Sequence, residues 1–433
     1  MMPDGWSHLS LAKISSAITS GSRDWAQYYS DSGAKFIRMT NLQRENIWLN
    51  LTDLKFVDIQ SDSADGRRTS LQLGDILMSI TAELGKIGWV NDGLGEAYIN
   101  QHTALIRINQ DTADSQFIAY LLSSKAMNSK INRLNDAGAK AGLNLSTIRA
   151  ISFDAPPLSE QKKIAQILST WDKAITTTEQ LLANSQQQKK ALMQQLLTGK
   201  KRFSLNGNYA YSVRDGFAKS KLGALPSDWK VELIKKHLWY QEGPGVRKHQ
   251  FTEQGVKLFN GTNIQFNKID LSNTKTRISE EECLGTYKHF LVDDGDLLIA
   301  CSGISVDRFD EKIAFASTAH LPLCMNTSTM RFKPLSDGGV DITYFHYFMQ
   351  SLVFKNQIRR QATGSAQLNF GPSHVGKCFV VIPSLEEQQK IAAVLSTADQ
   401  EISVLQQKLE ALKQEKKALM QQLLTGKRQV NIK

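Results

Sequence analysis

Apolar residues recur at alternating intervals of four and three along two segments of the chain, which is the pattern of a coiled-coil helix. In the segment near the C-terminus these positions are Ile391, Leu395, Ala398, Ile402, Leu405, Leu409, Leu412, Lys416, Leu419 and Leu423. At the same phase the earlier segment presents Ile164, Leu168, Trp171, Ile175, Thr178, Leu182, Ser185, Lys189, Leu192 and Leu196. One lysine interrupts the later seam, and the earlier seam is weaker. We therefore expect the two helices to pack on each other.

The two helical segments are copies of one sequence. Residues 160–200 match residues 387–427 without a gap, with 25 of 41 positions identical, and the final KKALMQQLLTGK is the same in both. Each copy begins after a proline with acidic residues in its first turn and ends at a glycine, as helices often do. A tandem duplication of this kind favours antiparallel pairing. The alternative is that each helix packs only on its own domain.

The rest of the sequence forms two globular regions. At 433 residues the chain exceeds what one hydrophobic core usually supports. The predicted order is a first domain (1–155), a first helix (156–202), a second domain (203–382) and a second helix (383–433). Short strand-like runs and a few helical stretches occur in both domains. We predict an α+β fold, with two domains related by a pseudo-two-fold axis and separated by two long antiparallel coiled-coil helices.

The two globular regions share short sequence matches in the same order. Gly74 to Leu77 matches Gly295 to Leu298, and Thr40 to Leu42 matches Thr262 to Ile264. Further matches pair His102, Thr103, Arg107, Leu143 and Asn144 with Asn326, Thr327, Arg331, Leu368 and Asn369, respectively. We interpret the domains as two versions of one fold whose framework is shared and whose remaining surface has diverged.

The net charge of +10 and the isoelectric point near 9.2 suggest a polyanionic partner. The charge is uneven: residues 1–155 contain 15 Lys and Arg against 16 Asp and Glu, whereas residues 156–202 contain 8 against 3. Residues 203–382 contain 21 against 17, and residues 383–433 contain 8 against 6. Because the first domain is nearly neutral, charge alone supports nucleic-acid binding only weakly.

Neither a membrane span nor a secretion signal is predicted, because no apolar run of about 18 residues occurs and the first ten residues lack a basic patch followed by an apolar stretch. The expected location is the cytoplasm. The four cysteines are widely spaced and form no C-x-x-C pair, which disfavours a zinc site or a disulfide framework.

Motifs for catalysis or cofactor binding are absent from the sequence. The two TGK triplets lack the upstream glycine and the hydroxyl residue of a phosphate-binding loop, and no zinc-protease, serine-hydrolase or dinucleotide-binding motif occurs. Asp154 to Pro157 is superficially similar to the Asp-Pro-Pro-aromatic motif of amino-methyltransferases, but Ala155 interrupts it and Leu158 replaces the aromatic residue. We interpret it as a strand-to-helix turn. No catalytic or metal site is predicted, and the chain is expected not to be an enzyme.

Together these features resemble the specificity subunit of type I restriction-modification enzymes over the whole chain. The most specific residues are the segments Pro157 to Asp172 and Pro383 to Asp399, which has the form P-x-x-x-E-Q-x-K-I-A-x-x-L-S-T-x-D; the first copy is one residue shorter. The shared A-L-M-Q-Q-L-L-T-G-K and the Gly-Asp-Ile-Leu element at Gly74 also resemble the family's.

The resemblance implies that the two domains are target recognition domains, each reading one half of a bipartite site in double-stranded DNA with an unread spacer between, and that two modification (methyltransferase) subunits dock on the helix pair. Because the domains share framework positions but few surface residues, we expect the site to be asymmetric. Because each helix spans roughly 38 residues, or about 57 Å, we expect the helix pair to set the spacer between the half-sites. S-adenosylmethionine, ATP and magnesium are expected on the modification and restriction subunits of the full complex, and no cofactor is expected on this chain.

Recognition surfaces of this family vary with the target, so we choose candidate DNA contacts by their chemistry: Asn and Gln read adenine, and Arg and Lys read guanine. The candidate base contacts are Thr40, Asn41, Gln43, Arg44, Gln101, His102, Asn144, Asn260, Thr262, Asn263, Gln265, Arg308 and Asn369. The candidate phosphate contacts are Lys35, Arg67, Arg68, Lys140, Arg247, Lys248, Arg359 and Arg360. For all of them the alternative is a turn-capping or solvated surface residue.

Three other readings of the sequence stay open. A stand-alone DNA-binding regulator would share the duplicated architecture but would need no methyltransferase partner. A structural coiled-coil adaptor would need no elaborate domains, and a nuclease would need a catalytic constellation that the sequence does not display.

Overall fold

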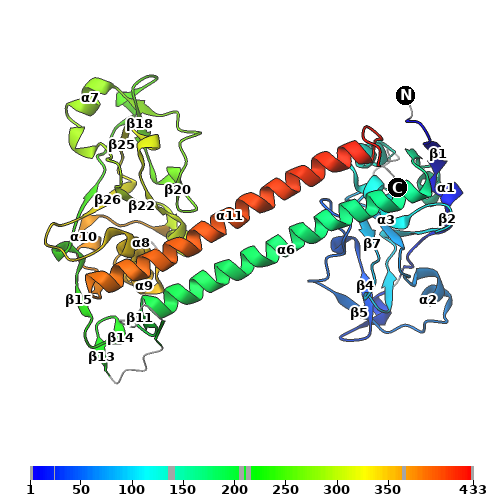
Figure 1. The fold of residues 1–433 in the computed structure, drawn as a ribbon, viewed down its shortest axis with the longest axis horizontal. Coiled ribbons are helices and arrows are strands. Elements are labelled where there is room, and N and C mark those ends of the chain that lie inside the picture. The colour runs from blue at the N-terminus through cyan, green and yellow to red at the C-terminus, as the bar shows by residue number, and fades with distance from the viewer. Residues whose placement is uncertain are drawn as a thin grey trace. The chain divides into compact units, whose positions relative to one another are not determined.

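The structure, a computed structural model, describes residues 3–23, 25–134, 142–203, 209–210, 216–362 and 367–430. It divides into two compact units (Figure 1). The first unit comprises Met1–Leu181 and Leu405–Lys433, and the second comprises Leu182–Val404. Each unit therefore contains one globular domain together with a segment of each long helix.

Within its described residues, the first unit contains two four-stranded sheets. The antiparallel sheet has the order β2 (Ser15–Ser20), β9 (Thr103–Ile108), β6 (Ile76–Ser79) and β7 (Ile87–Trp89). The other, in which β4 and β8 are parallel, has the order β3 (Tyr29–Ser30), β5 (Lys55–Val57), β4 (Ala34–Ile37) and β8 (Ala97–Ile99). A separate pair is formed by β1 (Ser7–Ser10) and β10 (Ser152–Ala155). The shorter helices are α1 (Leu11–Ile14), α2 (Ala64–Thr69), α3 (Ser115–Ser123), α4 (Lys125–Arg133) and α5 (Leu145–Arg149).

The described part of the second unit repeats this plan. Its antiparallel sheet has the order β16 (Leu238–Glu242), β26 (Thr329–Pro334), β22 (Leu297–Ala300) and β24 (Ile313–Phe315). Its other four-stranded sheet has the order β17 (Phe251–Thr252), β21 (Arg277–Ile278), β18 (Val256–Phe259) and β25 (Leu323–Met325). Two-stranded pairs are β15 (Lys230–Leu233) with β28 (Phe379–Ile382), β19 (Ile264–Gln265) with β20 (Lys268–Ile269), β23 (Ile304–Ser305) with β27 (Gln367–Leu368), β13 (Phe217–Ser220) with β14 (Gly223–Pro226) and β11 (Arg202–Phe203) with β12 (Tyr209–Ala210). The shorter helices are α7 (Glu280–Leu284), α8 (Ile342–Gln350), α9 (Leu352–Gln361) and α10 (Pro372–Val375).

Strand register corrects three of the sequence matches. Ile76 lies opposite Ile106 in the first unit, and its counterpart Leu297 lies opposite Phe332 in the second. The residue after each partner is Arg107 or Lys333, so Arg107 corresponds to Lys333, and matching it with Arg331 was wrong by two positions. The same shift makes Thr103 the counterpart of Thr329, so the matches of His102 with Asn326 and of Thr103 with Thr327 were also wrong. The sequence match aligned like residues, whereas the ladder of hydrogen bonds sets the true correspondence.

Two long helices, α6 (Leu158–Leu196) and α11 (Leu385–Leu423), contribute to both units. In the first unit, Asp172 pairs with Lys416 and Glu179 pairs with Lys413, so the sequence number rises along one helix as it falls along the other. The predicted antiparallel pairing is confirmed there. Both helices end before a glycine in the left-handed region, Gly199 or Gly426, a conformation that favours glycine.

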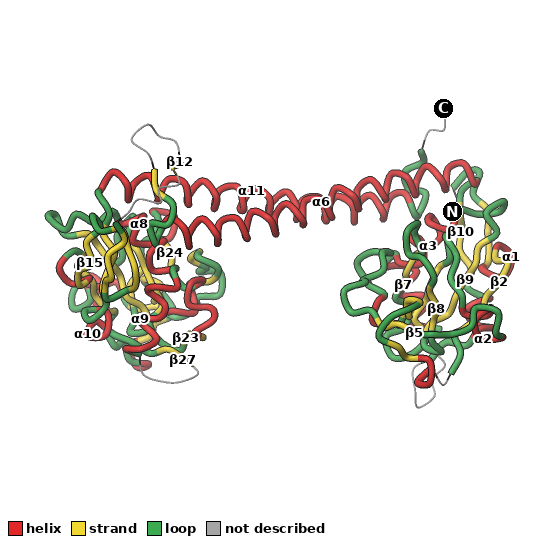
Figure 2. Tube along the Cα trace, turned by 90° about the horizontal axis from the view of Figure 1, so that it is seen from below, coloured by secondary structure: helices red, strands yellow, loops and turns green. Residues whose placement is uncertain are grey.

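The second unit repeats the antiparallel arrangement. Lys189 pairs with Asp399, and Ser185 donates to Glu401. Strands β15, β23, β24 and β27 of this unit lie to one side of its segments of α6 and α11 (Figure 2). No helix among the described residues is long and apolar enough to span a membrane.

The seam residues lie in two different environments. The fully buried ones join the globular cores: Ile164, Leu168 and Leu423 in the first unit, and Leu196, Ile391 and Leu395 in the second. Leu192 and Leu419 are partly buried against the same cores. The other apolar seam positions are half-buried: Trp171, Ile175, Leu182, Ala398, Ile402, Leu405, Leu409 and Leu412. Each domain core thus takes side chains from the start of one helix and the end of the other.

Candidate nucleic-acid interface

A cleft of about 630 Å³ opens in the first unit, lined by Ser20, Gly21, Arg23, Arg68, Thr81, Gln101 and His102. Three of these, Arg68, Gln101 and His102, are predicted DNA contacts. They come from helix α2 and from the turn between β8 and β9. Two guanidinium groups beside an amide and an imidazole offer donors suited to the acceptor-rich edge of guanine or to a phosphate.

Hydrogen bonds hold the cleft's side chains in place without a ligand. The Arg68 guanidinium donates to the Ser22 hydroxyl and, at 3.2 Å, to the Asp65 carboxylate. A ring nitrogen of His102 lies 2.9 Å from the Thr81 hydroxyl oxygen. Such preorganisation lowers the entropy cost of binding.

Two glycines allow a strand to lie close to the turn that bears the predicted contacts. A Cβ added to Gly21 would lie 2.0 Å from the Asn100 carbonyl oxygen, and one added to Gly243 would lie 2.4 Å from the Asn326 carbonyl oxygen. Only glycine fits such a close approach of two backbones. Because both units need it at the same point, this turn belongs to the shared framework.

The side chains on this framework differ between the units. Strand register makes Glu242 the counterpart of Ser20, and the turn residue after the asparagine is Gln101 in one unit and Thr327 in the other. Burial raises the pKa of the Glu242 carboxyl group. At these two positions the first unit therefore presents a hydroxyl and an amide group, whereas the second presents a carboxyl and a hydroxyl group.

Asn41 and Asn263 occupy equivalent positions, and each side chain holds a turn together. In each, Oδ1 accepts a 2.9 Å hydrogen bond from the main-chain N–H three residues earlier. Nδ2 donates to the carbonyl of Asn50 at 2.8 Å in the first unit and to that of Asp270 at 3.1 Å in the second. The amides shape the loops, and the exposed Thr40 and the half-buried Gln43 lie beside Asn41.

Three other predicted asparagines also bond within the protein. Asn144 caps helix α5, with Oδ1 accepting from the Thr147 N–H at 2.8 Å. Asn369 Oδ1 accepts from the Gly303 N–H at 2.9 Å. Asn260 Oδ1 accepts from Asn326 Nδ2 at 3.0 Å. These contacts position the loops, and Asn144 and Asn369 are exposed.

The structure brings three predicted contacts together at a hairpin of the second unit. Gln265 Nε2 donates to the Thr262 carbonyl at 2.8 Å. The Arg308 guanidinium lies 5.5 Å from the centre of the Phe266 ring and donates to Glu311 at 2.8 Å. Phe266 was not among the predicted contacts, although it follows Gln265 directly.

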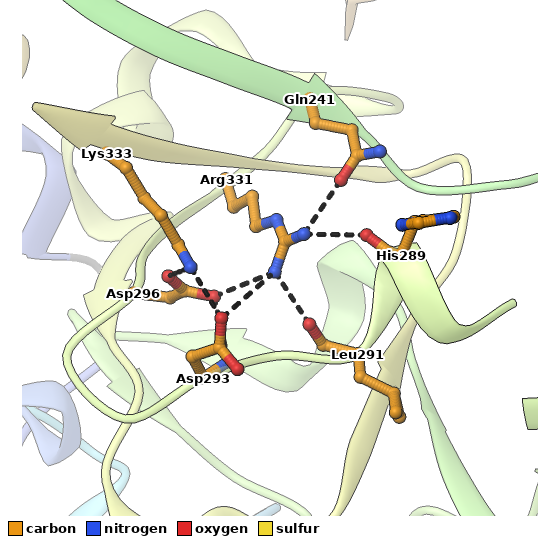
Figure 3. A network of polar contacts seen from close by, with 7 residues as sticks. All are labelled: Gln241, His289, Leu291, Asp293, Asp296, Arg331 and Lys333. Carbon is orange, nitrogen blue, oxygen red and sulfur yellow. Dashed lines mark hydrogen bonds and ion pairs between the residues drawn. The ribbon is translucent and has the colours of Figure 1, made fainter. Parts of the chain in front are cut away.

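A buried arginine organises a neighbouring part of the second unit (Figure 3). Arg331 donates to the carbonyls of His289 and Leu291 at 2.6 Å, to Gln241 at 2.9 Å and to Asp296 at 3.1 Å. In the first unit Arg107 makes the corresponding bonds, to Asp75 and to the Ser70 carbonyl. Asp75 holds the pKa of Arg107 above its ordinary value through this hydrogen bond. Both networks are structural and tie a loop to the central sheet.

The predicted phosphate contacts are scattered over both domains. Six are exposed: Arg67, Arg68, Arg247, Lys248, Arg359 and Arg360. Lys35 is half-buried, and its ammonium donates to the Leu94 carbonyl. Lys140 lies outside the described residues.

Sequence reasoning missed Arg23 and Thr81 in the cleft and Phe266 at the hairpin. No pattern marks the first two, which come together only through the fold. The sequence could have indicated Phe266, because Ile264 to Ile269 has an apolar residue at each end and is short enough to form a β-hairpin with a two-residue turn at its centre. Among the described residues, no group of three or more His, Cys, Asp or Glu is placed to hold a metal ion.

Residues 15–184 and 226–414 match the family model of the type I restriction modification DNA specificity domain. These two ranges include most of both globular domains and much of both long helices. The repeated match agrees with the internal duplication.

Curated relatives carry the same description. The chain is 25% identical over 346 residues to the type I restriction enzyme MjaVIII specificity subunit of Methanocaldococcus jannaschii, which covers 79% of this chain and 78% of the relative. It is also 25% identical over 444 residues to the putative type I restriction enzyme MjaX specificity subunit of the same organism, covering 99% of this chain and 95% of the relative.

Solved structures share the fold. The type I restriction-modification system S subunit from M. genitalium superposes with a TM-score of 0.59 at 13% identity, over 100% of both chains. A chain from a study of complex assembly and conformational transition of the type I R-M system gives a TM-score of 0.55 at 15% identity, over 99% of this chain and 100% of that one. The predicted α+β fold class is confirmed.

Proposed function

Because the chain belongs to the type I restriction modification DNA specificity family, we propose that each of its globular domains reads one half of a bipartite site in double-stranded DNA. The two half-sites differ, so the full target is asymmetric. The chain supplies recognition, and its partners supply catalysis.

The observation that carries this proposal is the shared framework with different chemistry on it. Gly21 and Gly243 place equivalent turns against equivalent strands, yet the cleft beside the first turn carries Arg68 and Gln101. The second unit has Glu242 at the strand position where this cleft has Ser20. Arginine favours guanine and a carboxylate favours cytosine, so two domains built alike on these residues would prefer different bases.

We further propose that the helix pair sets the spacer and docks two modification subunits. The identical final segments of α6 and α11, KKALMQQLLTGK, give the two units alike helical surfaces, which suits two copies of one partner. S-adenosylmethionine binds the modification subunits, whereas ATP and magnesium serve the restriction subunits. No cofactor binds this chain.

Methylome sequencing tests the proposal. Cells that lack other methyltransferases would express this chain together with the modification subunit encoded beside it. The expected result is one methylated motif made of two unlike specific halves and an unread spacer. A continuous methylated motif would refute the bipartite reading, and no new methylation would refute the proposal and favour a stand-alone regulator.

A further inference from the structure

The hairpin of β19 and β20 in the second unit exposes an aromatic residue at its tip. Ile264 pairs with Ile269 and Gln265 pairs with Lys268, so Phe266 and Asn267 form the two-residue turn. The Phe266 side chain is 67% exposed. An apolar ring this exposed gains nothing from the protein core and contributes its apolar surface to solvent.

The backbone at this tip is also unfavourable for phenylalanine. Phe266 has a φ of 49° and Asn267 a φ of 60°, the left-handed pair that a type I′ turn requires. Asparagine and glycine adopt this conformation readily, whereas a bulky side chain is a genuine outlier there. Phe266 therefore combines an exposed ring with a strained backbone, a combination that selection for stability alone would remove.

The rest of the hairpin is anchored. Ile264 is fully buried in the core of the second unit, and the Asn267 N–H donates to the Glu311 carbonyl at 2.9 Å. The Lys312 ammonium donates to the Ile264 carbonyl at 2.7 Å. The exposed ring is thus carried on a rigid support rather than on a loose loop.

A cation accompanies the ring. The Arg308 guanidinium lies 5.5 Å from the centre of the Phe266 ring, and its 2.8 Å bond to Glu311 orients it. A flat apolar surface beside a positive charge matches a nucleobase attached to a phosphate. Gln265 precedes Phe266 in the chain, and its side-chain amide donates to the Thr262 carbonyl at 2.8 Å.

We propose that Phe266 is a wedge that inserts between neighbouring base pairs in the half-site read by the second unit, while Arg308 neutralises the adjacent phosphate. This inference rests on the proposed function. Proteins that insert apolar side chains between base pairs partly unstack that step, and steps of pyrimidine followed by purine open most easily. The second half-site is therefore expected to contain or adjoin such a step.

The first unit has no such wedge at the equivalent position. Asn41 and Asn263 correspond, and the residues three positions beyond them are Arg44 and Phe266. The Arg44 guanidinium donates to Asn128 Oδ1 at 3.0 Å. Distortion of the DNA is thus expected in the second half-site only.

The test uses the complete complex with its modification subunits and duplexes that carry the methylated motif. 2-Aminopurine, whose fluorescence rises on unstacking, replaces adenines in and beside each half-site in turn. The wild-type complex is expected to raise fluorescence at one step of the second half-site. Phe266→Asn, which keeps a residue favoured in the left-handed turn, should abolish this rise and weaken binding about tenfold. The melting temperature should be unchanged or higher.

Two control variants sharpen the test. Phe266→Trp should keep the fluorescence rise, and Phe251→Ala, which removes another exposed ring of the second unit, should change neither signal nor affinity. Unchanged fluorescence and affinity in Phe266→Asn would overturn the inference, as would a loss of modification-subunit binding, since the ring would then be a protein contact. A wild-type complex without any bipartite motif would instead refute the proposed function, before this experiment begins.

Discussion

Lys416 and Asp172, which are 244 positions apart in the sequence, form an ion pair whose side chains are only 7% and 6% exposed. The Tyr120 hydroxyl donates to the second carboxylate oxygen at 2.5 Å. The duplicate pair in the second unit, Lys189 and Asp399, is 2.6 Å apart, with Asp399 41% exposed. The lysine that interrupts each seam therefore sets the register of the two helices within its unit.

Replacing Lys416 with methionine should destabilise the chain strongly. The Asp172 carboxylate would stay buried without its cation, and breaking a buried pair from one side costs about 3–5 kcal/mol. The matched variant Lys189→Met should cost about 1 kcal/mol, because Asp399 is partly solvated. Urea unfolding of the purified chain measures both changes in the free energy of unfolding.

The double variant Asp172→Asn with Lys416→Met provides the control. It removes both charges and should recover part of the stability lost in Lys416→Met. In a coiled-coil seam without a buried ion pair, replacing a lysine with an apolar residue would stabilise the helix pair instead. A Lys416→Met chain as stable as the wild type would therefore show that the ion pair has no role in register.

His346 should make the second unit sensitive to mild acid. It is buried beside Lys189 and Asp399, and burial, followed by the charge of Lys189, lowers its pKa to about 4. In the unfolded chain the pKa is about 6.5, so between these values the unfolded chain binds a proton that the folded chain refuses. Stability falls as the pH drops through this window, by about 2 kcal/mol between pH 7 and pH 5.

The variant His346→Leu isolates this contribution. The first unit has Ala119 at the corresponding place on α3, so a non-titrating residue fits the fold. The difference in unfolding free energy between pH 7 and pH 5 should be smaller in the variant than in the wild type. An equal difference in both chains would mean that His346 does not titrate in this range.

Arg68 and its neighbour Arg67 offer a matched pair for the cleft of the first unit. Both are exposed on α2, but only Arg68 lines the cleft. Arg68→Ala should reduce the difference in binding free energy between the preferred base and other bases in the first half-site by about 1–3 kcal/mol. Base discrimination in the second half-site should be unchanged. Arg67→Ala should lower affinity slightly and equally for all sequences.

Competition binding at one stated salt concentration measures both variants, with duplexes altered in either half-site. Melting temperatures would show whether losing the bonds from Arg68 to Ser22 and Asp65 disturbs the fold. Equal losses for matched and altered first half-sites would place Arg68 on the backbone of the DNA instead of on a base.

The long helices could be predicted because their signals are local and repeated. The 4-3 spacing, the terminal glycines and the duplicated segment all lie in contiguous sequence. The partners of the seam lysines could not be predicted in this way. Asp172 and Tyr120 come from different elements, and only the packing of α3 against α6 brings them to Lys416.

The globular domains show a different limit of prediction from sequence. Matching residues of the same type aligned Arg107 with Arg331, although strand register makes Lys333 the equivalent of Arg107 in the second unit. Side chains two positions apart on a strand face the same side, so a long arginine reaches the equivalent aspartate from either place. The contacts to bases stay predictions for a similar reason. Sequence indicates which residues have suitable chemistry, but the cleft depends on Gly21 and on turns that only the fold assembles.

If each domain reads its own half of the target, exchanging one domain should change only that half. Residues 1–155 would be replaced by the equivalent domain of another specificity subunit, and the methylome of cells expressing the hybrid with the same modification subunit would be compared with that of the wild type. We expect a motif in which one half changes while the other half stays as it was. A change in both halves, from a hybrid that assembles and methylates DNA, would contradict domain-wise reading.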